Sequence, residues 1–294
     1  MPRLFIFGVG FTGEALARAV LADGWQVAGT SRSSEKCARL KALGIDAVPF
    51  DRAHALAPDA LTGTTHLLSS VPPDERGDPV LASAYDALAR LGRIAWQGYL
   101  STTGVYGDRA GGWVDERSEL RPVGERGQRR VAAEQGWLAL GARTGTPTQL
   151  FRLPGIYGPG RSPLDDLRAG TARRIDKPGQ VFSRIHVDDI VQVLRASMAR
   201  PDPGAAYNVT DDEAAPSSEV IAFAAGLLGI APPPVIPFAE AKLSPMAASF
   251  YGESKRVRND RIKSELGVAL RYPSYREGLR AIISRPDPSP APAG

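Results

Sequence analysis

A short apolar run near the N-terminus ends in three closely spaced glycines, and this feature constrains the fold most. Residues 3–7 are followed by Gly8, Gly10 and Gly13, and apolar side chains then recur at helical spacing through residues 15–20. A strand, a tight turn and a helix are the context in which this glycine pattern binds a dinucleotide. We expect Gly8 to permit the turn, Gly10 to let the backbone approach a pyrophosphate, and Gly13 to allow close helix packing.

The start of the helix after the turn is the second part of this expected site. Its first backbone N–H groups, around Phe11 and Thr12, have no partner within the helix, and the helix dipole places partial positive charge there. Both properties favour a phosphate group. The residues of the turn that we expect to contact the cofactor are Gly8, Gly10, Phe11, Thr12 and Gly13.

The segment after the expected second strand indicates which dinucleotide binds. The strand Trp25–Gly29 runs into Thr-Ser-Arg-Ser-Ser, without the acidic residue that holds the ribose hydroxyls in an NAD site. Arg32 could bind a 2′-phosphate through its guanidinium fork, with Ser31 or Ser33 as a neutral donor. The sequence therefore predicts NADP as the cofactor. NAD as the cofactor, and Arg32 as an ordinary surface residue, are the alternatives.

Strands and helices alternate through the first half of the chain. Further strands are expected at Ile45–Pro49, His66–Val71, Arg93–Leu100 and Pro147–Leu153, with helices at 34–43, Leu81–Leu91 and Val131–Leu140. This alternation predicts an α/β fold with a Rossmann-type, doubly wound parallel sheet. Ligands of such sheets bind at the carboxyl ends of the strands. The residues at these ends that we expect to face one crevice are Asp51, Ser70, Thr102 and Pro154.

The alternation loosens after Gly158, which suggests a second structural unit. We expect residues 1–158 to form the NAD(P)-binding Rossmann domain and residues 159–285 to form a smaller substrate lobe over the crevice. A helix over residues 188–198 is expected to pack back onto the sheet. The proline-rich tail, residues 286–294, is predicted to be disordered.

Charge and composition restrict the classes of ligand. The chain has 294 residues and a formal net charge of +4, and its one dense basic cluster, Arg126–Arg130, has no interleaved aromatic residues. These features argue against nucleic-acid binding. The single cysteine, Cys37, and three well-separated histidines do not suggest a metal site.

The expected environment follows from hydropathy. No apolar run reaches the length needed to span a membrane, and the N-terminus enters a strand directly, without the layout of a signal peptide. We therefore expect a cytoplasmic protein without a membrane partner. A small-molecule substrate is the expected partner, and a homodimer is left open.

Six further segments carry a resemblance to a known family. They follow the glycine turn in a fixed order and are Leu100–Gly107, Val114–Pro122, Phe151–Arg161, Ser183–Asp189, Lys255–Gly267 and Tyr272–Gly278. Together they make nearly the whole chain resemble the extended short-chain dehydrogenase/reductase family, within the NAD-dependent epimerase/dehydratase superfamily. The resemblance implies a Rossmann fold, a nicotinamide cofactor and a substrate lobe.

The resemblance also implies a catalytic trio of Ser or Thr, Tyr and Lys, the last two in a Tyr-x-x-x-Lys pattern. Thr102 matches the hydroxyl position, but the Tyr and Lys positions hold Arg126 and Arg130. A divergent, atypical branch of the superfamily is similar in this respect. Arg130 could still hold the ribose hydroxyls, whereas Arg126 cannot replace tyrosine because guanidinium stays protonated. Asp51 resembles the acid that contacts adenine in this family, with a simple loop turn as the alternative.

Four other residues are weaker catalytic candidates. Tyr251 and Lys255 form a literal Tyr-x-x-x-Lys, but their place after the lobe argues against catalysis. Tyr106, next to Thr102, could donate a proton, with a packing role as the alternative. His186 is expected to be a structural residue before a helix capped by the pair Asp188–Asp189.

Two functions are compatible with these features. The first is an oxidoreductase or epimerase-type enzyme that prefers NADP and acts on an unidentified small molecule or nucleotide sugar, with Thr102 and an unassigned acid or base. The second is an NADP-binding sensor or interaction protein without redox turnover, which the missing tyrosine favours.

Overall fold

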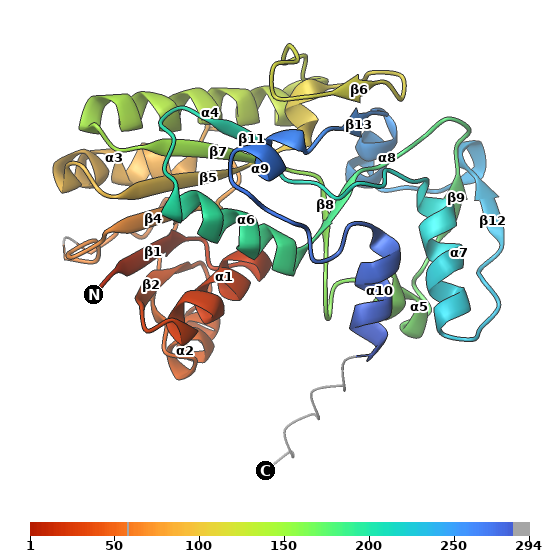
Figure 1. The fold of residues 1–294 in the computed structure, drawn as a ribbon, viewed down its shortest axis with the longest axis horizontal. Helices are drawn as coiled ribbons and strands as arrows, with labels where there is room; N and C mark the ends of the chain where they lie inside the picture. Colours follow the sequence, from red (N-terminus) through yellow and green to blue (C-terminus); the bar gives the residue numbers. More distant parts are fainter. Residues whose placement is uncertain (58, 285–294) are drawn as a thin grey trace.

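A seven-stranded parallel sheet forms the centre of the molecule (Figure 1). The computed structural model describes residues 1–57 and 59–284. From edge to edge the strands are β11 (Ala206–Asn208), β7 (Thr148–Leu153), β5 (Trp96–Thr102), β4 (His66–Ser69), β1 (Arg3–Phe7), β2 (Gln26–Ser31) and β3 (Asp46–Pro49). This order confirms the predicted Rossmann-type, doubly wound fold.

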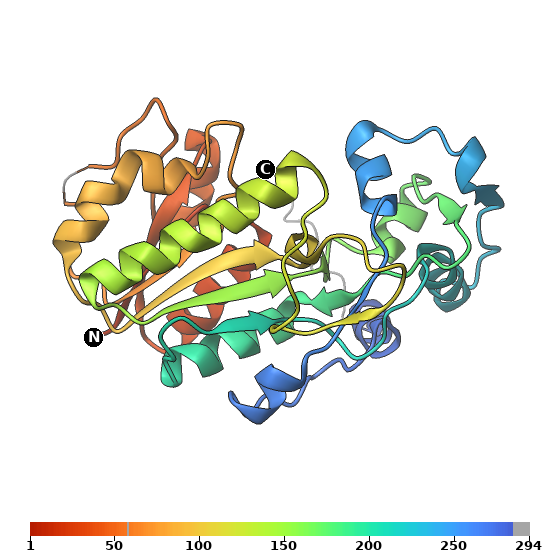
Figure 2. The same ribbon diagram turned by 90° about the horizontal axis from the view of Figure 1, so that it is seen from above.

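Helices cover both faces of the sheet, and strand β1 shows why, because it carries apolar side chains on both faces. Because side chains alternate along a strand, Leu4 and Ile6 join one apolar cluster while Phe5 and Phe7 join another. The first face is covered by α1 (Phe11–Ala22), α2 (Ser34–Ala42) and α6 (Val187–Ala199), and the second by α3 (Pro79–Leu91) and α4 (Gly124–Thr144). Figure 2 shows the two helical layers on opposite sides of the strands.

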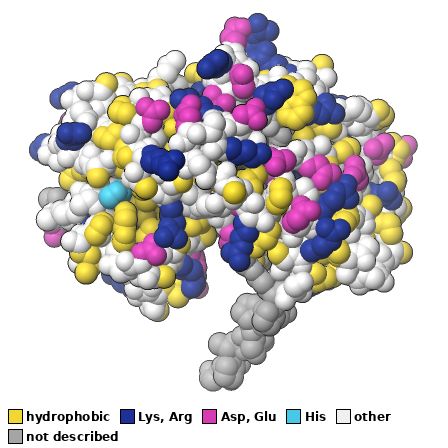
Figure 3. Space-filling view, in the orientation of Figure 1, with side chains coloured by type: hydrophobic (Ala, Val, Ile, Leu, Met, Phe, Trp, Pro, Cys, Tyr) yellow, Lys and Arg dark blue, Asp and Glu magenta, His cyan; other side chains and the backbone are white. Residues whose placement is uncertain are grey.

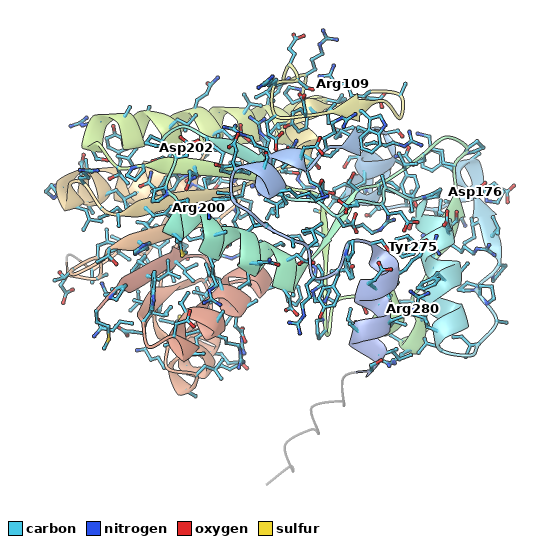
Figure 4. All side chains as sticks on the ribbon, in the orientation of Figure 1. Arg109, Asp176, Arg200, Asp202, Tyr275 and Arg280 are labelled. Atoms are coloured by element: carbon cyan, nitrogen blue, oxygen red, sulfur yellow. The ribbon has the colours of Figure 1, made fainter. Side chains whose placement is uncertain are left out.

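A smaller lobe lies beyond the carboxyl ends of the strands. Its elements are β8 (Gly155–Tyr157), β9 (Arg174–Asp176), β10 (Arg184–His186), β12 (Val235–Pro237), η2 (Phe238–Glu240), α5 (Pro163–Arg168), α7 (Ser217–Leu227), α8 (Pro245–Tyr251) and α10 (Tyr275–Ser284). Helices α5, α7 and α10 share an apolar core. Tyr275 and Arg280 lie on α10 (Figure 4), where the Tyr275 hydroxyl donates to Glu219 of α7 at 3.0 Å.

Four short elements join the sheet to the lobe. They are η1 (Thr103–Tyr106), β6 (Trp113–Val114), β13 (Arg256–Val257) and α9 (Asp260–Ser264). Strand β13 comes from the C-terminal part of the chain and pairs with β6, which follows η1. The segment after the sheet's fifth strand in sequence, β5, is therefore held by residues about 140 positions later in the chain.

Two elements differ from the sequence prediction. Strand β11 was expected within the smaller lobe, but it pairs with β7 and completes the central sheet. Helix α4 was expected over Val131–Leu140, but it begins at Gly124 and ends at Thr144. Its first two turns are rich in Arg and Gln, so they lack the apolar periodicity from which the helix was recognised.

Charged side chains of both signs are interspersed over the face of the molecule seen in Figure 3. Among the described residues, no helix is long and apolar enough to cross a membrane. Within the same ranges, His, Cys, Asp and Glu side chains form no group of three that could hold a metal ion.

Candidate cofactor and substrate site

The three glycines after β1 each have a distinct place in the turn. Gly8 has φ +76°, a conformation that favours glycine, and its N–H donates to the Thr30 hydroxyl at 2.9 Å. A Cβ on Gly13 would lie only 3.2 Å from the Ile6 side chain, so this glycine lets α1 approach β1. A Cβ on Gly10 would meet only the Gly8 carbonyl oxygen, at 3.9 Å, so space remains beside the backbone there.

Helix α1 begins directly after Gly10 without a side-chain cap. Phe11 and Thr12 are its first two residues, and Thr12 is buried. N–H groups that lack a capping side chain at a helix start are suited to bind phosphate. The turn and the helix start therefore fit the pyrophosphate of a dinucleotide.

Ser70, after β4, contacts the same turn. Its hydroxyl donates to the Gly8 carbonyl oxygen at 2.5 Å. A Cβ on Gly8 would lie 2.9 Å from the Val71 side chain, so β1 and β4 approach closely here. Ser70 thus shapes the turn, and a direct cofactor contact by Ser70 stays a prediction.

Arg32 stands exposed beyond the end of β2. Among the described residues it makes no ion pair or hydrogen bond, whereas Arg39 on α2 is paired with Glu14 at 2.5 Å. The Ser33 hydroxyl accepts the Lys36 N–H and caps α2, and the Ser31 hydroxyl accepts the Ser33 N–H at 3.4 Å. The guanidinium of Arg32 is therefore available to an anion at this end of the sheet.

Asp51, after β3, is engaged in its own loop. Its carboxylate accepts hydrogen bonds from the His54 ring at 2.9 Å and from the N–H groups of His54 and Ala53 at 2.9 and 2.7 Å. These bonds, the His54 ring first among them, hold the pKa of Asp51 below its usual range. The geometry favours the loop-turn interpretation over an adenine contact.

Thr102 and Pro154 end two neighbouring strands. Thr102 of β5 is opposite Leu153 of β7, and Pro154 follows at once. Thr102 is partly exposed, and its hydroxyl accepts the Gly104 N–H at 3.1 Å, which leaves the hydroxyl proton for another acceptor. The strand register thus places Thr102 and Pro154 on the edge that also carries Gly8 and Ser70.

The start of α4 lies against the end of β5. Arg130 donates to the Leu100 carbonyl oxygen at 2.6 Å. A Cβ on Gly127 would lie 3.4 Å from the Gly104 carbonyl oxygen, so α4 and η1 touch. Arg126 stands one turn before Arg130 and is exposed. The start of α4 that lies against β5 and η1 therefore carries Arg126 and Arg130.

Tyr106 is fully buried and committed to other partners. Its hydroxyl donates to Asn208 at 2.7 Å and accepts from Arg152 at 2.9 Å. Burial raises the pKa of the Tyr106 hydroxyl to about 12. The geometry favours the packing role that the sequence left open.

A buried ion pair lies next to Tyr106, because one of its members, Arg152, donates to the Tyr106 hydroxyl. The Glu134 and Arg152 side chains are joined at 2.8 Å and are only 4% and 7% exposed. Ser101 of β5 also donates to Glu134, at 2.5 Å. This network connects α4, β5 and β7 directly beneath the end of β5.

Tyr251 and Lys255 belong to the lobe and the segment that leaves it. The Tyr251 ring packs against Phe182 and Phe238, with centroids 5.3 and 5.2 Å away. Lys255 donates to the Gly107 carbonyl oxygen at 2.8 Å and pairs with Glu253 at 2.5 Å. These contacts favour structural roles for both residues.

His186 is a structural residue, and it replaces the cap expected for α6. The sequence suggested the pair Asp188–Asp189 as the cap, but the His186 ring accepts the Asp188 N–H at 3.1 Å. Asp189 instead accepts the N–H groups of Arg271 and Tyr272 at 2.7 and 3.1 Å. Burial raises the pKa of Asp189 to about 6.

A cavity of 430 Å³ lies next to β8, which follows Pro154. Its lining includes Tyr157, Arg184 and Tyr275. The guanidinium carbon of Arg161, another lining residue, lies 5.5 Å from the ring centroid of Phe11, the first residue of α1. The cavity can hold a small molecule, and it adjoins the strand end that carries Pro154.

Three features of the site were not recognised from the sequence. Thr30 holds the glycine turn, Phe250 of α8 touches Arg126, and the pair of Glu134 and Arg152 lies below Tyr106. An arginine inside the otherwise uncharged strand Thr148–Leu153 signals a buried carboxylate partner, because an unpaired buried charge is costly. Nothing local in the sequence indicates the contact with Phe250.

Sequence comparisons connect the chain to known proteins. No protein-family model matches it. It is 30% identical to protein YeeZ of Escherichia coli K12 over 287 residues, covering 93% of this chain and 97% of YeeZ. It is also 30% identical, over 181 residues, to the 3-diazoavenalumate denitrifying reductase of a Streptomyces species, covering 57% of this chain and 53% of the reductase.

Solved structures share the fold. A functionally unknown conserved protein from Silicibacter pomeroyi is 53% identical, with a TM-score of 0.90 over 96% of this chain and 98% of that one. MoeE5, in complexes with NAD and UDP-glucose or UDP-glucuronic acid, is 22% identical, with TM-scores of 0.78 and 0.77 over at least 95% of either chain. Other neighbours include nucleotide-sugar epimerases and dehydratases bound to NAD, members of the NAD-dependent epimerase/dehydratase superfamily. The chain therefore has the Rossmann-type fold of that superfamily, and it belongs to the family of protein YeeZ.

Proposed function

We propose that the protein is an NADP(H)-dependent enzyme of the oxidoreductase or epimerase type that acts on a small molecule such as a nucleotide sugar. The observation that carries the proposal is the glycine turn after β1, with open space beside Gly10 and an uncapped helix start. The nucleotide-sugar complexes of MoeE5 and the Streptomyces reductase support the reaction class.

The residues of this chain that would hold the cofactor are Gly8, Gly10, Phe11, Thr12, Gly13, Ser31, Arg32, Ser70, Arg130 and Pro154. Bound NADP(H) would supply hydride chemistry at its nicotinamide ring. Thr102 would orient a substrate oxygen, because its hydroxyl proton is available for a hydrogen bond. Arg130 would donate hydrogen bonds from α4 to the ribose.

NADP preference over NAD is expected to depend on Arg32. The wild-type protein should bind NADP at least about tenfold more tightly than NAD, since a charge-assisted hydrogen bond contributes about 1.5–3 kcal/mol. In Arg32→Ala this preference should collapse. Calorimetric titration with both cofactors measures it.

The matched control for Arg32→Ala is Arg143→Ala. Arg143 lies in the last turn of α4 and packs over Tyr85, so its loss changes the net charge equally without touching the end of β2. The control should keep the preference. Equal affinities of the wild type for NADP and NAD would contradict the assignment of Arg32.

An NADP-binding protein without redox turnover is the second candidate. The observation in its favour is that, near Thr102, the Tyr106 hydroxyl is buried and already bonded to Asn208 and Arg152. Arg126, on the facing side of α4, cannot supply a proton because guanidinium stays protonated. The absorbance of NADPH during incubation with candidate substrates separates the two functions.

Simple carbonyl compounds are expected to be reduced slowly. General acid–base catalysis contributes about a hundred- to ten-thousand-fold in rate. Tyr99 and Tyr106, the described tyrosines nearest to Thr102 in the sequence, are both fully buried. A panel of aldehydes, ketones and nucleotide sugars with NADPH tests this. Tyr251→Phe should leave any turnover unchanged, and fast turnover that this substitution removes would make Tyr251 the acid.

A further inference from the structure

Arg126 differs from the other basic residues near the start of α4 in its partners. Arg129 is paired with Glu125, and Arg121 is paired with Glu119 at 2.5 Å. Within the described ranges, the Arg126 guanidinium has neither an ion pair nor a hydrogen bond, although the side chain is exposed. Arg126 is thus a cation without a carboxylate, beside η1.

The contact that Arg126 does make comes from the lobe. Its guanidinium carbon lies 5.2 Å from the ring centroid of Phe250, in the last turn of α8. Phe250 is 52% exposed, so the ring is not part of the lobe core. In Figure 2, α8, in the blue part of the lobe, lies across a space from the start of α4, and the two side chains meet between them. The pair therefore bridges the sheet and the lobe and fixes the direction of the guanidinium.

The helix start that carries Arg126 also lies against the strand end that carries Thr102, the residue proposed to orient the substrate. Arg130 reaches Leu100 and Gly127 abuts Gly104, so this part of α4 runs along the strand end that contains Thr102. Arg126 precedes Gly127 and lies one turn from Arg130. A group bound to Arg126 would accordingly lie next to a substrate oxygen held by Thr102.

We infer that Arg126, oriented by Phe250, binds a carboxylate on the reacting part of the substrate, so that the substrate is an acid. This inference rests on the proposed function. A guanidinium presents a planar fork that matches a carboxylate through two hydrogen bonds. It cannot take part as a proton donor, so recognition is the role that its chemistry allows. The ring of Phe250 lies over one face of the fork, so the edge that carries the N–H groups stays available to a ligand.

A matched pair of ligands tests the inference. UDP-glucuronic acid and UDP-glucose differ by one carboxylate on the sugar, while the diphosphate is common to both. Calorimetric titration of the NADP-loaded protein should show UDP-glucuronic acid bound at least about tenfold more tightly. The difference should vanish in Arg126→Ala and shrink in Arg126→Lys, which keeps the charge but lacks the fork.

Two further variants separate recognition from folding. Phe250→Ala should reduce the difference, because the guanidinium loses its ring platform, while the melting temperature stays close to that of the wild type. Arg129→Ala, one turn away on the same helix but paired with Glu125, should keep the full difference. Free glucuronate and glucose are titrated as a second pair, in case the nucleotide does not fit.

The outcomes are distinct. Equal affinities within both pairs, a difference that persists in Arg126→Ala, or a parallel weakening of both UDP-sugars in that variant would each overturn the inference. Absence of binding by all four compounds would overturn it as well. NADP binding is measured separately, and the sugar titrations are repeated without cofactor. A failure to bind NADP therefore contradicts the proposed function alone.

Discussion

Gly10→Val is expected to abolish NADP(H) binding while the protein remains folded. Gly10 has φ −92° and ψ −159°, an extended conformation with negative φ that does not require glycine, and a Cβ there would meet only the Gly8 carbonyl oxygen. The valine side chain would instead fill the space that the pyrophosphate needs beside the start of α1. Losing two charge-assisted hydrogen bonds corresponds to at least about a hundredfold in affinity. Calorimetry measures the affinity for NADP(H), and a thermal melt measures whether the variant is folded.

The contrasting variant at this turn is Gly8→Ala. Gly8 has φ +76°, and a Cβ would lie 2.9 Å from Val71, so this substitution should destabilise the fold by about 1–2 kcal/mol or more. Together the two variants separate the structural role of the turn from its role in binding. Retained cofactor affinity in Gly10→Val would show that the turn is structural only.

Arg152→Met is expected to lower the free energy of unfolding by about 3–5 kcal/mol. The substitution leaves the Glu134 carboxylate buried with Ser101 as its remaining partner, and it removes a donor to the Tyr106 hydroxyl. An uncompensated buried charge costs more than the ion pair itself contributes. Urea unfolding followed by circular dichroism measures the loss.

A double-mutant cycle isolates the ion pair. Glu134→Leu alone should also destabilise the protein, because it leaves Arg152 unpaired, whereas Glu134→Leu combined with Arg152→Met should recover part of the stability. Additive effects of the two single substitutions would show that the two side chains are not coupled in solution.

The Rossmann core was predictable because its signals are local. The run Leu4–Phe7 is apolar at every position, as expected for a strand buried on both faces, and the glycines after it can be recognised one by one. Strand β11 was assigned to the wrong part because it has only three residues, and its partner β7 lies more than fifty residues earlier. No local pattern encodes that pairing.

The residues of the candidate site also differ in how well the sequence predicted their roles. Residues whose role depends on backbone geometry, such as Gly8 and Gly13, were interpreted from spacing alone. Tyr106 was ambiguous because its partners Arg152 and Asn208 are 46 and 102 residues away. Whether a polar side chain faces solvent or is hydrogen-bonded within a buried network depends on tertiary packing. A single sequence does not show that packing.

The position of β11 and α6 affects how the protein can be divided. Both elements follow lobe segments in the sequence, yet they cover the edge and one face of the central sheet. A fragment ending at residue 158 would lack this cover and expose apolar residues such as Leu153 and Phe151. The two parts therefore cannot be exchanged between relatives as cassettes, and a chimaera must carry residues 187–209 with the sheet.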